Sequence, residues 1–130
     1  MRSELITYIT NNLPSAFKAS TELPFGEGGN PLFRKNMKRV YVGNEQVEQT
    51  VLQAIMNGAD VMETRTTLFA YLAVDAKNRS SDLDSALSVM ANARTQSGIS
   101  ASFRNEFTYT TEIDEGVEIY TFEYNFYTIA

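Results

Sequence analysis

The fold of this chain is decided by residues 102–129, which read SFRNEFTYTTEIDEGVEIYTFEYNFYTI. Apolar side chains take the odd positions of the first half, at Phe103, Phe107, Tyr109 and Ile113. Polar and charged side chains stand between them, at Arg104, Glu106, Thr108, Thr110 and Glu112. This period of two predicts a β-strand with one dry face.

A turn follows this strand at Asp114–Gly116. Gly116 can adopt a positive φ, which would close a three-residue loop and place Ile113 opposite Val117. The return strand would then be Val117–Ile129, which is aromatic almost to its end. The stretch therefore predicts one long C-terminal β-hairpin.

The apolar phase of the return strand changes along its length. Val117 and Ile119 are odd positions, whereas the apolar residues after them are even: Tyr120, Phe122, Tyr124 and Phe126. Either the strand bulges near residue 119, or it has apolar surface on both faces. Because a strand with two apolar faces needs a second partner, we expect the hairpin to contact another subunit as well as its own core.

Charge is unevenly distributed along the chain. The formal net charge is −5, and residues 105–130 contain six acidic residues and no basic one, while all 11 Lys and Arg precede them. Tight binding to DNA or RNA comes chiefly from basic groups that meet phosphates, so an acidic hairpin argues against it. Like charge would instead suit a surface that DNA passes without adhering.

Length and composition narrow the class of protein. The chain has 130 residues, of which 43% are hydrophobic and 21% charged, as in one globular domain spanning residues 1–130. It contains neither Cys nor His, so we expect no disulfide, no zinc or haem site and no cofactor. We see no apolar signal core and no run long enough to span a bilayer, and we expect a cytosolic protein without a membrane partner.

The N-terminal third is predicted to contain a helix, a strand and a loop. Ser3 can cap a helix whose apolar stripe ends at Leu13, before Pro14. Residues 17–23 can form a short strand. Residues 24–37 contain three of the seven glycines, and we expect them to form a flexible loop.

The middle of the chain contains one ambiguous segment. Residues 38–43 predict a strand, and residues 60–75 a long strand across the middle of the sheet. Between them, Val47, Val51 and Ile55 recur every four residues after Asn44 and before Gly58, which favours a helix over a strand at 44–56.

A further helix is predicted from Ser80 or Ser81, because its apolar face is continuous: Leu83, Ala86, Leu87, Met90 and Ala93. The sum is an α+β fold with an antiparallel or mixed sheet of about five to six strands. Two helices, or three if 44–56 is helical, would pack on it.

Three sequence features resemble catalytic or ligand sites but lack the necessary context. Gly26, Gly28 and Gly29 match neither the phosphate-binding loop nor the dinucleotide fingerprint. Asp75, Asp82 and Asp84 lack the spacing of a calcium loop, and the last two fit the first turn of a helix. The carboxylates at the hairpin turn have nothing to separate their pKa values. We therefore expect no metal site, no catalytic residue and no enzyme activity.

Four of the 11 basic residues cluster at Arg34, Lys35, Lys38 and Arg39, beside Phe33 and Tyr41. The cluster can be a solvated loop, a nucleic-acid patch, or a contact with the acidic hairpin of a neighbouring copy. In the third interpretation, Phe33 and the four basic residues would meet three aromatic residues of the hairpin: Tyr120, Phe122 and Tyr124.

The order of elements resembles that of the tail terminator, or tail completion, proteins of long-tailed bacteriophages. The resemblance lies in the helix ending at Leu13-Pro14, the strand at residues 38–42, the long strand ending at Asp75 with the following Ala76-Lys77-Asn78, the helix at residues 83–90 and the closing aromatic hairpin. It covers nearly the whole chain but includes no short diagnostic motif. It implies a strand at residues 44–56, against the local pattern.

The resemblance also implies a function. Such proteins form a ring, expected to be a hexamer, that caps the tail tube, ends its polymerisation and provides the interface to the head connector. The partners would be other copies, the major tail tube protein and the connector protein. The location would be the tail or neck of the virion, and the host cytoplasm during assembly.

DNA would only pass through the ring, and Glu118 and Glu123 would face that channel or a partner. The alternatives are another neck or head-closure protein of the particle, and a stand-alone cytosolic protein-binding module.

Overall fold

The computed structural model describes residues 2–20, 37–53, 61–77, 81–95, 104–114 and 116–129. Its helices are α1 (Arg2–Asn12) and α2 (Ser81–Asn92), and a 3-10 turn, η2 (Ala93–Thr95), continues α2. The strands are β1 (Lys18–Ser20), β2 (Arg39–Val42), β3 (Gln46–Gln53), β4 (Val61–Asp75), β5 (Arg104–Asp114) and β6 (Val117–Ile129). The expected α+β fold with two helices and a C-terminal hairpin is confirmed.

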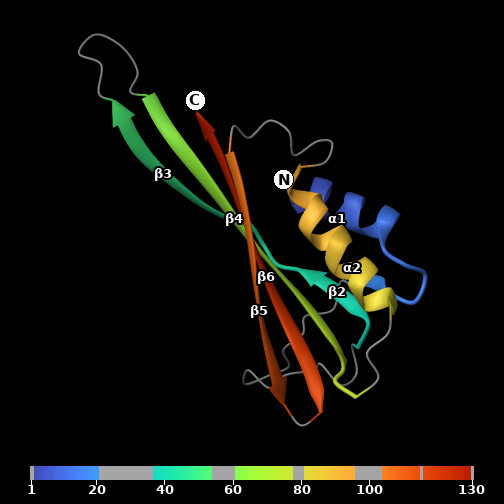
Figure 1. Cartoon of the computed structure of the whole chain (residues 1–130). Coiled ribbons are helices and arrows are strands. Elements are labelled where there is room, and N and C mark those ends of the chain that lie inside the picture. Colours follow the sequence, from blue (N-terminus) through green and yellow to red (C-terminus); the bar gives the residue numbers. More distant parts are fainter. Residues whose placement is uncertain are drawn as a thin grey trace.

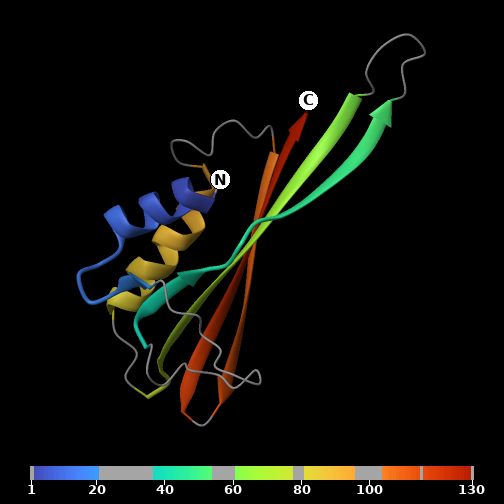
Figure 2. The ribbon, with the colours of Figure 1, turned by 180° about the vertical axis from the view of Figure 1, so that it is seen from behind.

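The six strands form one mixed sheet with the order β1-β2-β4-β6-β5. The long strand β4 is central, as predicted. β3 pairs with the first half of β4, and β2 pairs with its second half on the same side. Only the β1–β2 pair is parallel. Both helices cover one face of the sheet, while β3 and β4 extend together beyond them (Figures 1 and 2).

The core lies between the helices and the sheet. Leu5 and Ile9 of α1 and the predicted apolar face of α2 are buried against even-numbered residues of β4 and β6. Leu68, Leu72, Phe122, Tyr124 and Phe126 are all fully covered. Burying one such side chain stabilises the fold by about 1.5–3 kcal/mol, so this layer provides the main driving force for folding.

Arg2 fastens the start of α1 to the end of β2. Its guanidinium donates hydrogen bonds to the carbonyl oxygens of Val42, at 2.8 Å from Nη2, and Gly43, at 2.9 Å from Nε. These bonds satisfy carbonyl groups where the chain leaves β2, and they are stronger than neutral ones because the donor is charged. The helix is thus positioned by a polar contact as well as by apolar packing.

The prediction that a helix is favoured at residues 44–56 is wrong for the described part of this segment, because Gln46–Gln53 forms strand β3. Val47 and Val51 are four residues apart, and a strand places them on one face just as a helix does. Both are exposed, at 59% and 49%, so no buried helical stripe exists there. The strand implied by the resemblance is what the structure has at these positions.

The hairpin also differs in two details from the prediction. Asp114, not Ile113, lies opposite Val117, although Gly116 has the expected positive φ of 83°. The first strand lacks a dry face, because Tyr109 and Ile113 are 49% and 67% exposed. Tyr109 lies at the centre of β5 and Ile113 near its end, and β5 is an edge strand of the sheet.

The change of phase in β6 arises from two apolar faces and not from a bulge. All 13 residues of β6 pair with β4 without a register shift. Tyr120 and the even residues after it enter the main core, whereas Val117 and Ile119 form a small cluster with Ala73 on the opposite face.

The other N-terminal predictions are borne out in part. Lys18–Ser20 is the described part of the strand expected at 17–23. Most of the loop expected at 24–37 lies outside the described residues, and its last residue, Met37, forms an isolated bridge to Ala73.

Candidate assembly surface

The two described residues of the predicted basic cluster, Lys38 and Arg39, lie at one edge of the sheet. Lys38 immediately precedes β2 and Arg39 begins it, and the parallel pairing of β1 with β2 places Lys18 beside Arg39. All three side chains are exposed, and no acidic residue occurs in β1, β2 or the turn at Lys38. We call Lys18, Lys38 and Arg39 the basic edge. Phe33, Arg34 and Lys35 lie outside the described residues, so their proposed contact stays a prediction.

Lys38 holds this edge in place through its backbone. It has a φ of 61°, which L residues with a side chain seldom adopt. Its amide donates to the carbonyl oxygen of Ala73 at 2.8 Å, and its own carbonyl accepts from the amide of Lys18 at 3.0 Å. The turn therefore ties β1 and β2 to β4. Sequence reasoning missed Lys18, since only the pairing of strands separated by a loop brings it to the cluster.

The aromatic residues predicted to contact a neighbour are buried within their own subunit. Tyr120, Phe122 and Tyr124 are at most 2% exposed and pack in the core beneath the helices. The Tyr124 hydroxyl donates to the carbonyl oxygen of Met90 in α2 at 2.5 Å. We therefore remove these three residues from the predicted subunit contact. Their apolar face is covered by the chain's own helices.

Glu118 and Glu123, both predicted to face a channel, lie on opposite faces of the sheet. Glu118 shares the helix side with Tyr120, whose hydroxyl donates to it. Glu123 is half-buried on the other face, opposite Phe69 of β4 and Thr108 of β5. One channel surface cannot include both carboxylates, so only Glu123 remains a candidate for the sheet face that the helices leave open.

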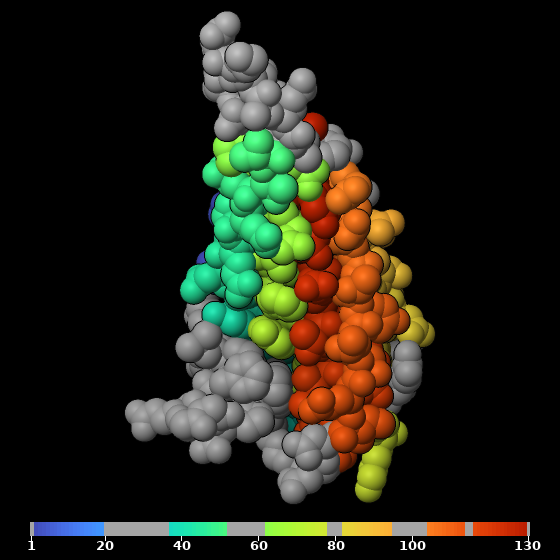
Figure 3. All heavy atoms as spheres, turned by 90° about the vertical axis from the view of Figure 1, so that its left-hand side faces the viewer, coloured from blue at the N-terminus to red at the C-terminus, as the bar shows by residue number. Residues whose placement is uncertain are grey.

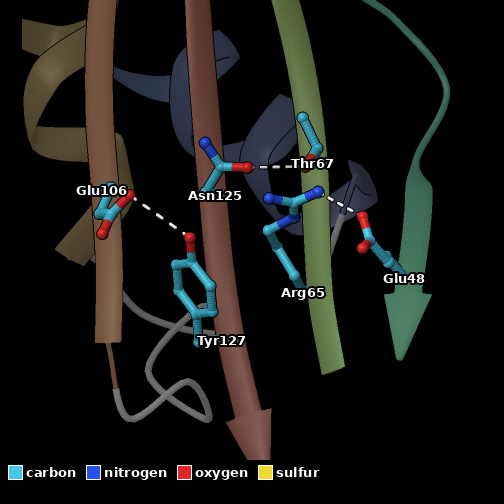
Figure 4. Close-up of polar contacts among 6 residues, drawn as sticks. All are labelled: Glu48, Arg65, Thr67, Glu106, Asn125 and Tyr127. Carbon is cyan, nitrogen blue, oxygen red and sulfur yellow. Dashed lines mark hydrogen bonds and ion pairs between the residues drawn. The ribbon is translucent and has the colours of Figure 1, made fainter. Parts of the chain in front are cut away.

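That face is broad and is formed by β3, β4, β6 and β5 side by side (Figure 3). We call it the helix-free face. Two of the charged side chains on it are paired across strands, because Arg65 of β4 forms an ion pair with Glu48 of β3. On the other side, the Arg104 guanidinium lies 3.9 Å from the centre of the Tyr127 ring, and the Tyr127 hydroxyl donates to Glu106 at 3.4 Å (Figure 4).

Between these pairs, the Thr67 hydroxyl donates to the amide oxygen of Asn125 at 2.6 Å (Figure 4). Thr67 is only 9% exposed, so this bond satisfies a polar group that the flat sheet has nearly covered. The Glu48 carboxylate raises the pKa of Arg65 above its ordinary value. The Thr-rich first half of the segment at residues 60–75 was the only sequence signal for this polar surface.

Carboxylates considered for metal binding have structural roles or lie apart. Asp82 and Asp84 occupy the first turn of α2, where negative charge is favoured by the helix dipole. Asp75 accepts a hydrogen bond from the Lys77 amide at 2.9 Å in the turn after β4. Among the described residues, no three Asp or Glu side chains gather in a group that could hold a metal ion.

Two comparisons of this chain with known proteins were made, with family models and with curated proteins. No protein-family model matches it, and no curated protein matches it. Among the described helices, none is long and apolar enough to cross a membrane. The function must therefore be argued from the surfaces of the molecule.

Proposed function

We propose that this chain is a structural assembly protein of a long-tailed bacteriophage. Copies associate into a ring, with six the expected number, and the ring caps the tail tube and ends its polymerisation. The same ring then presents the interface to the head connector. Its other partner is the major tail tube protein, and it resides in the tail or neck of the virion.

One observation carries the proposal. The resemblance to tail terminators implied a strand at residues 44–56, whereas the local pattern favoured a helix, and the chain forms strand β3 there. This is the one segment at which the two lines of reasoning disagreed. The rest of the element order also agrees with the resemblance, from α1 through β4 and α2 to the closing hairpin.

The helix-free face is compatible with the passage of DNA. Arg65 and Arg104, the basic side chains on β3, β4, β5 and β6, are engaged by Glu48, Glu106 and Tyr127. Neither guanidinium is left without an acidic or aromatic partner, and Glu123 adds negative charge. Lys18 and Arg39 lie outside these strands, at the edge formed by β1 and β2. Because affinity for DNA depends on basic groups that meet phosphates, such a face would not retain the polymer.

The test uses polymerised tail tube protein from the phage that encodes this chain. Electron microscopy should show this protein as rings at tube ends, and tubes should stop elongating once it is added. Light scattering should show a hexamer, either free or on the tubes. The proposal would be refuted if the protein did not bind tube ends and formed only a dimer at every protein and salt concentration.

A further inference from the structure

The two edges of the sheet carry opposite charge at the same height. Pairing can be followed strand by strand from Ala19 to Val40, Leu72, Tyr120 and Thr111. Lys18 comes before Ala19 in β1, and Glu112 comes after Thr111 in β5. Because β1 and β5 run in opposite directions in this sheet, Lys18 and Glu112 lie at the same level on opposite edges.

These charges also lie on the same face. Ala19 pairs with Val40, whose side chain is in the core, so its neighbour Lys18 and the paired Arg39 belong to the helix-free face. Glu112 pairs with Ile119, which is also on the helix-free face. All three side chains are exposed, and none forms an ion pair with another described residue.

Strand β5 ends the strand order of the sheet, and no other described strand pairs with its outer side. It runs for 11 residues with no Pro and no register shift against β6. Its centre, residues 107–111, carries no charge, and its described charged side chains stand near its ends. Natural edge strands usually prevent association with central lysines, prolines or bulges. A bare edge of this length is a template for another strand.

We propose that the β5 edge of one copy binds the basic edge of a second copy, so that the two sheets continue into one another. If neighbouring copies are related by rotation about an axis parallel to the strands, the strands of both copies keep the same directions. The helix-free face of both copies also stays on the same side. Because β1 and β5 run in opposite directions, β5 of one copy pairs antiparallel with β1 of the next. Glu112 then approaches Lys18 and Arg39 of the next copy. The contact is head-to-tail, and each copy keeps one edge of each kind, as a closed ring requires.

Two other pairings of β5 fit less well. A two-fold antiparallel pairing of β5 with itself, centred on Tyr109, would place Glu106 opposite Glu112, and like charges directly opposite are destabilising. Strand β3, which also forms an edge, contains Glu48 and no basic residue. The basic edge is the described part of the sheet that complements β5 in charge, level, face and direction.

Charge reversal tests this contact in the full chain. Glu112→Lys should weaken self-association at least tenfold in sedimentation or light scattering. Adding Lys18→Glu and Arg39→Glu to the same chain restores opposite signs and should recover affinity to within about threefold of the starting protein, a difference of less than 1 kcal/mol. Glu4→Lys, on exposed α1, makes the same charge change elsewhere and should have little effect. Circular dichroism confirms that each variant folds.

The proposal is overturned if Glu112→Lys and Glu4→Lys behave alike, if the triple variant associates no better than Glu112→Lys, or if the starting protein never associates. Cross-linking gives an independent readout, because the chain has no Cys. Ala19→Cys with Thr111→Cys should give ladders of oligomers with a short bismaleimide. Neither single variant should cross-link, because its one Cys then faces a residue without a thiol. An efficient dimer from Thr111→Cys alone would indicate two-fold pairing of β5 and contradict the head-to-tail arrangement.

The inference specifies the contact on which the proposed ring rests, but its test needs no tail tubes. If charge reversal and rescue behave as expected while the protein ignores tube ends, the edge contact stands and the tail function fails. If the protein caps tubes while the charge variants have no effect, the tail function stands and the edge contact is wrong.

Discussion

A single hydroxyl group, that of Tyr124, links the centre of the sheet to α2. The ring is fully covered, and its oxygen donates to the Met90 carbonyl. Burial raises the pKa of Tyr124 well above the ordinary value. Burial also raises the pKa of Tyr71, with the nearby Tyr41 as a second cause. Both groups stay protonated in the folded state at a pH where the unfolded chain would release the protons.

The sign of the pH dependence follows from these two shifts. The stabilisation from keeping these protons is fully present below about pH 10, the ordinary tyrosine value, and is lost as the pH rises further. The loss is up to about 1.4 kcal/mol per pH unit for the buried Tyr124 and smaller for Tyr71, which is partly exposed. Tyr124→Phe should cost about 1 kcal/mol at pH 8. It should also make the decline between pH 10 and 11 less steep, as measured by urea unfolding. Equal slopes for both proteins would contradict this assignment.

Substitutions of Lys38 measure how much free energy its positive φ costs. Its positive φ suits Asn or Gly and strongly disfavours a β-branched residue. We expect Lys38→Val to lower the free energy of unfolding by about 1–2 kcal/mol. Lys38→Asn removes the same charge at a tolerated φ and should change it by less than about 0.5 kcal/mol. Thermal unfolding at low protein concentration measures both, and equal losses would show that the charge matters and the backbone does not.

At the scale of elements, the hairpin shows what an alternating pattern can and cannot establish. Alternation predicted both strands, and the continuous apolar stripe of α2 predicted that helix, because each pattern has one matching geometry. The spacing of Val47 and Val51 led to the wrong prediction of a helix, because a spacing of four residues places side chains on one face of a strand and of a helix alike. Nor could the sequence say which hairpin face the helices would cover. On the face that they do cover, Phe122 is buried, whereas Ile113, on the same face near the end of β5, is exposed.

Two residues on the helix side of the hairpin, one covered and one exposed, therefore predict very different costs for truncation. Phe122→Ala opens a cavity in the main core and should lower the free energy of unfolding by about 3–5 kcal/mol. Ile113→Ala, at a residue 67% exposed, should cost less than about 1 kcal/mol. Urea unfolding of the two variants compares them directly. Similar losses would mean that the exposed end of β5 is covered in solution.

At the scale of the molecule, one cluster of buried residues joins α1, α2, β2, β4 and β6. Helices and sheet should therefore unfold in a single cooperative transition. Circular dichroism follows the helices, and tyrosine fluorescence follows the strands, because the chain has seven Tyr and no Trp. The two urea curves should coincide for the monomer. Loss of the helical signal at a lower urea concentration would show that the sheet is stable without its helices.

The candidate surface was less predictable than the fold, for reasons that also lie at this scale. The charges at Lys18, Arg39 and Glu112 were visible in the sequence, but their common level and face depend on pairing across five strands. The Arg65 and Glu48 pair depends on a strand that the local pattern favoured as a helix. Sequence patterns describe one strand at a time, and a surface is built from several.

The unbroken pairing of β4 with β6 has a mechanical consequence. Every residue of β6 is paired, so a load applied along the strands is shared by the whole ladder at once instead of opening it bond by bond. A slip of even one residue would exchange the core face with the open one. The paired strands β4 and β6 should therefore resist extension and transmit force along the strand direction from one end of the molecule to the other.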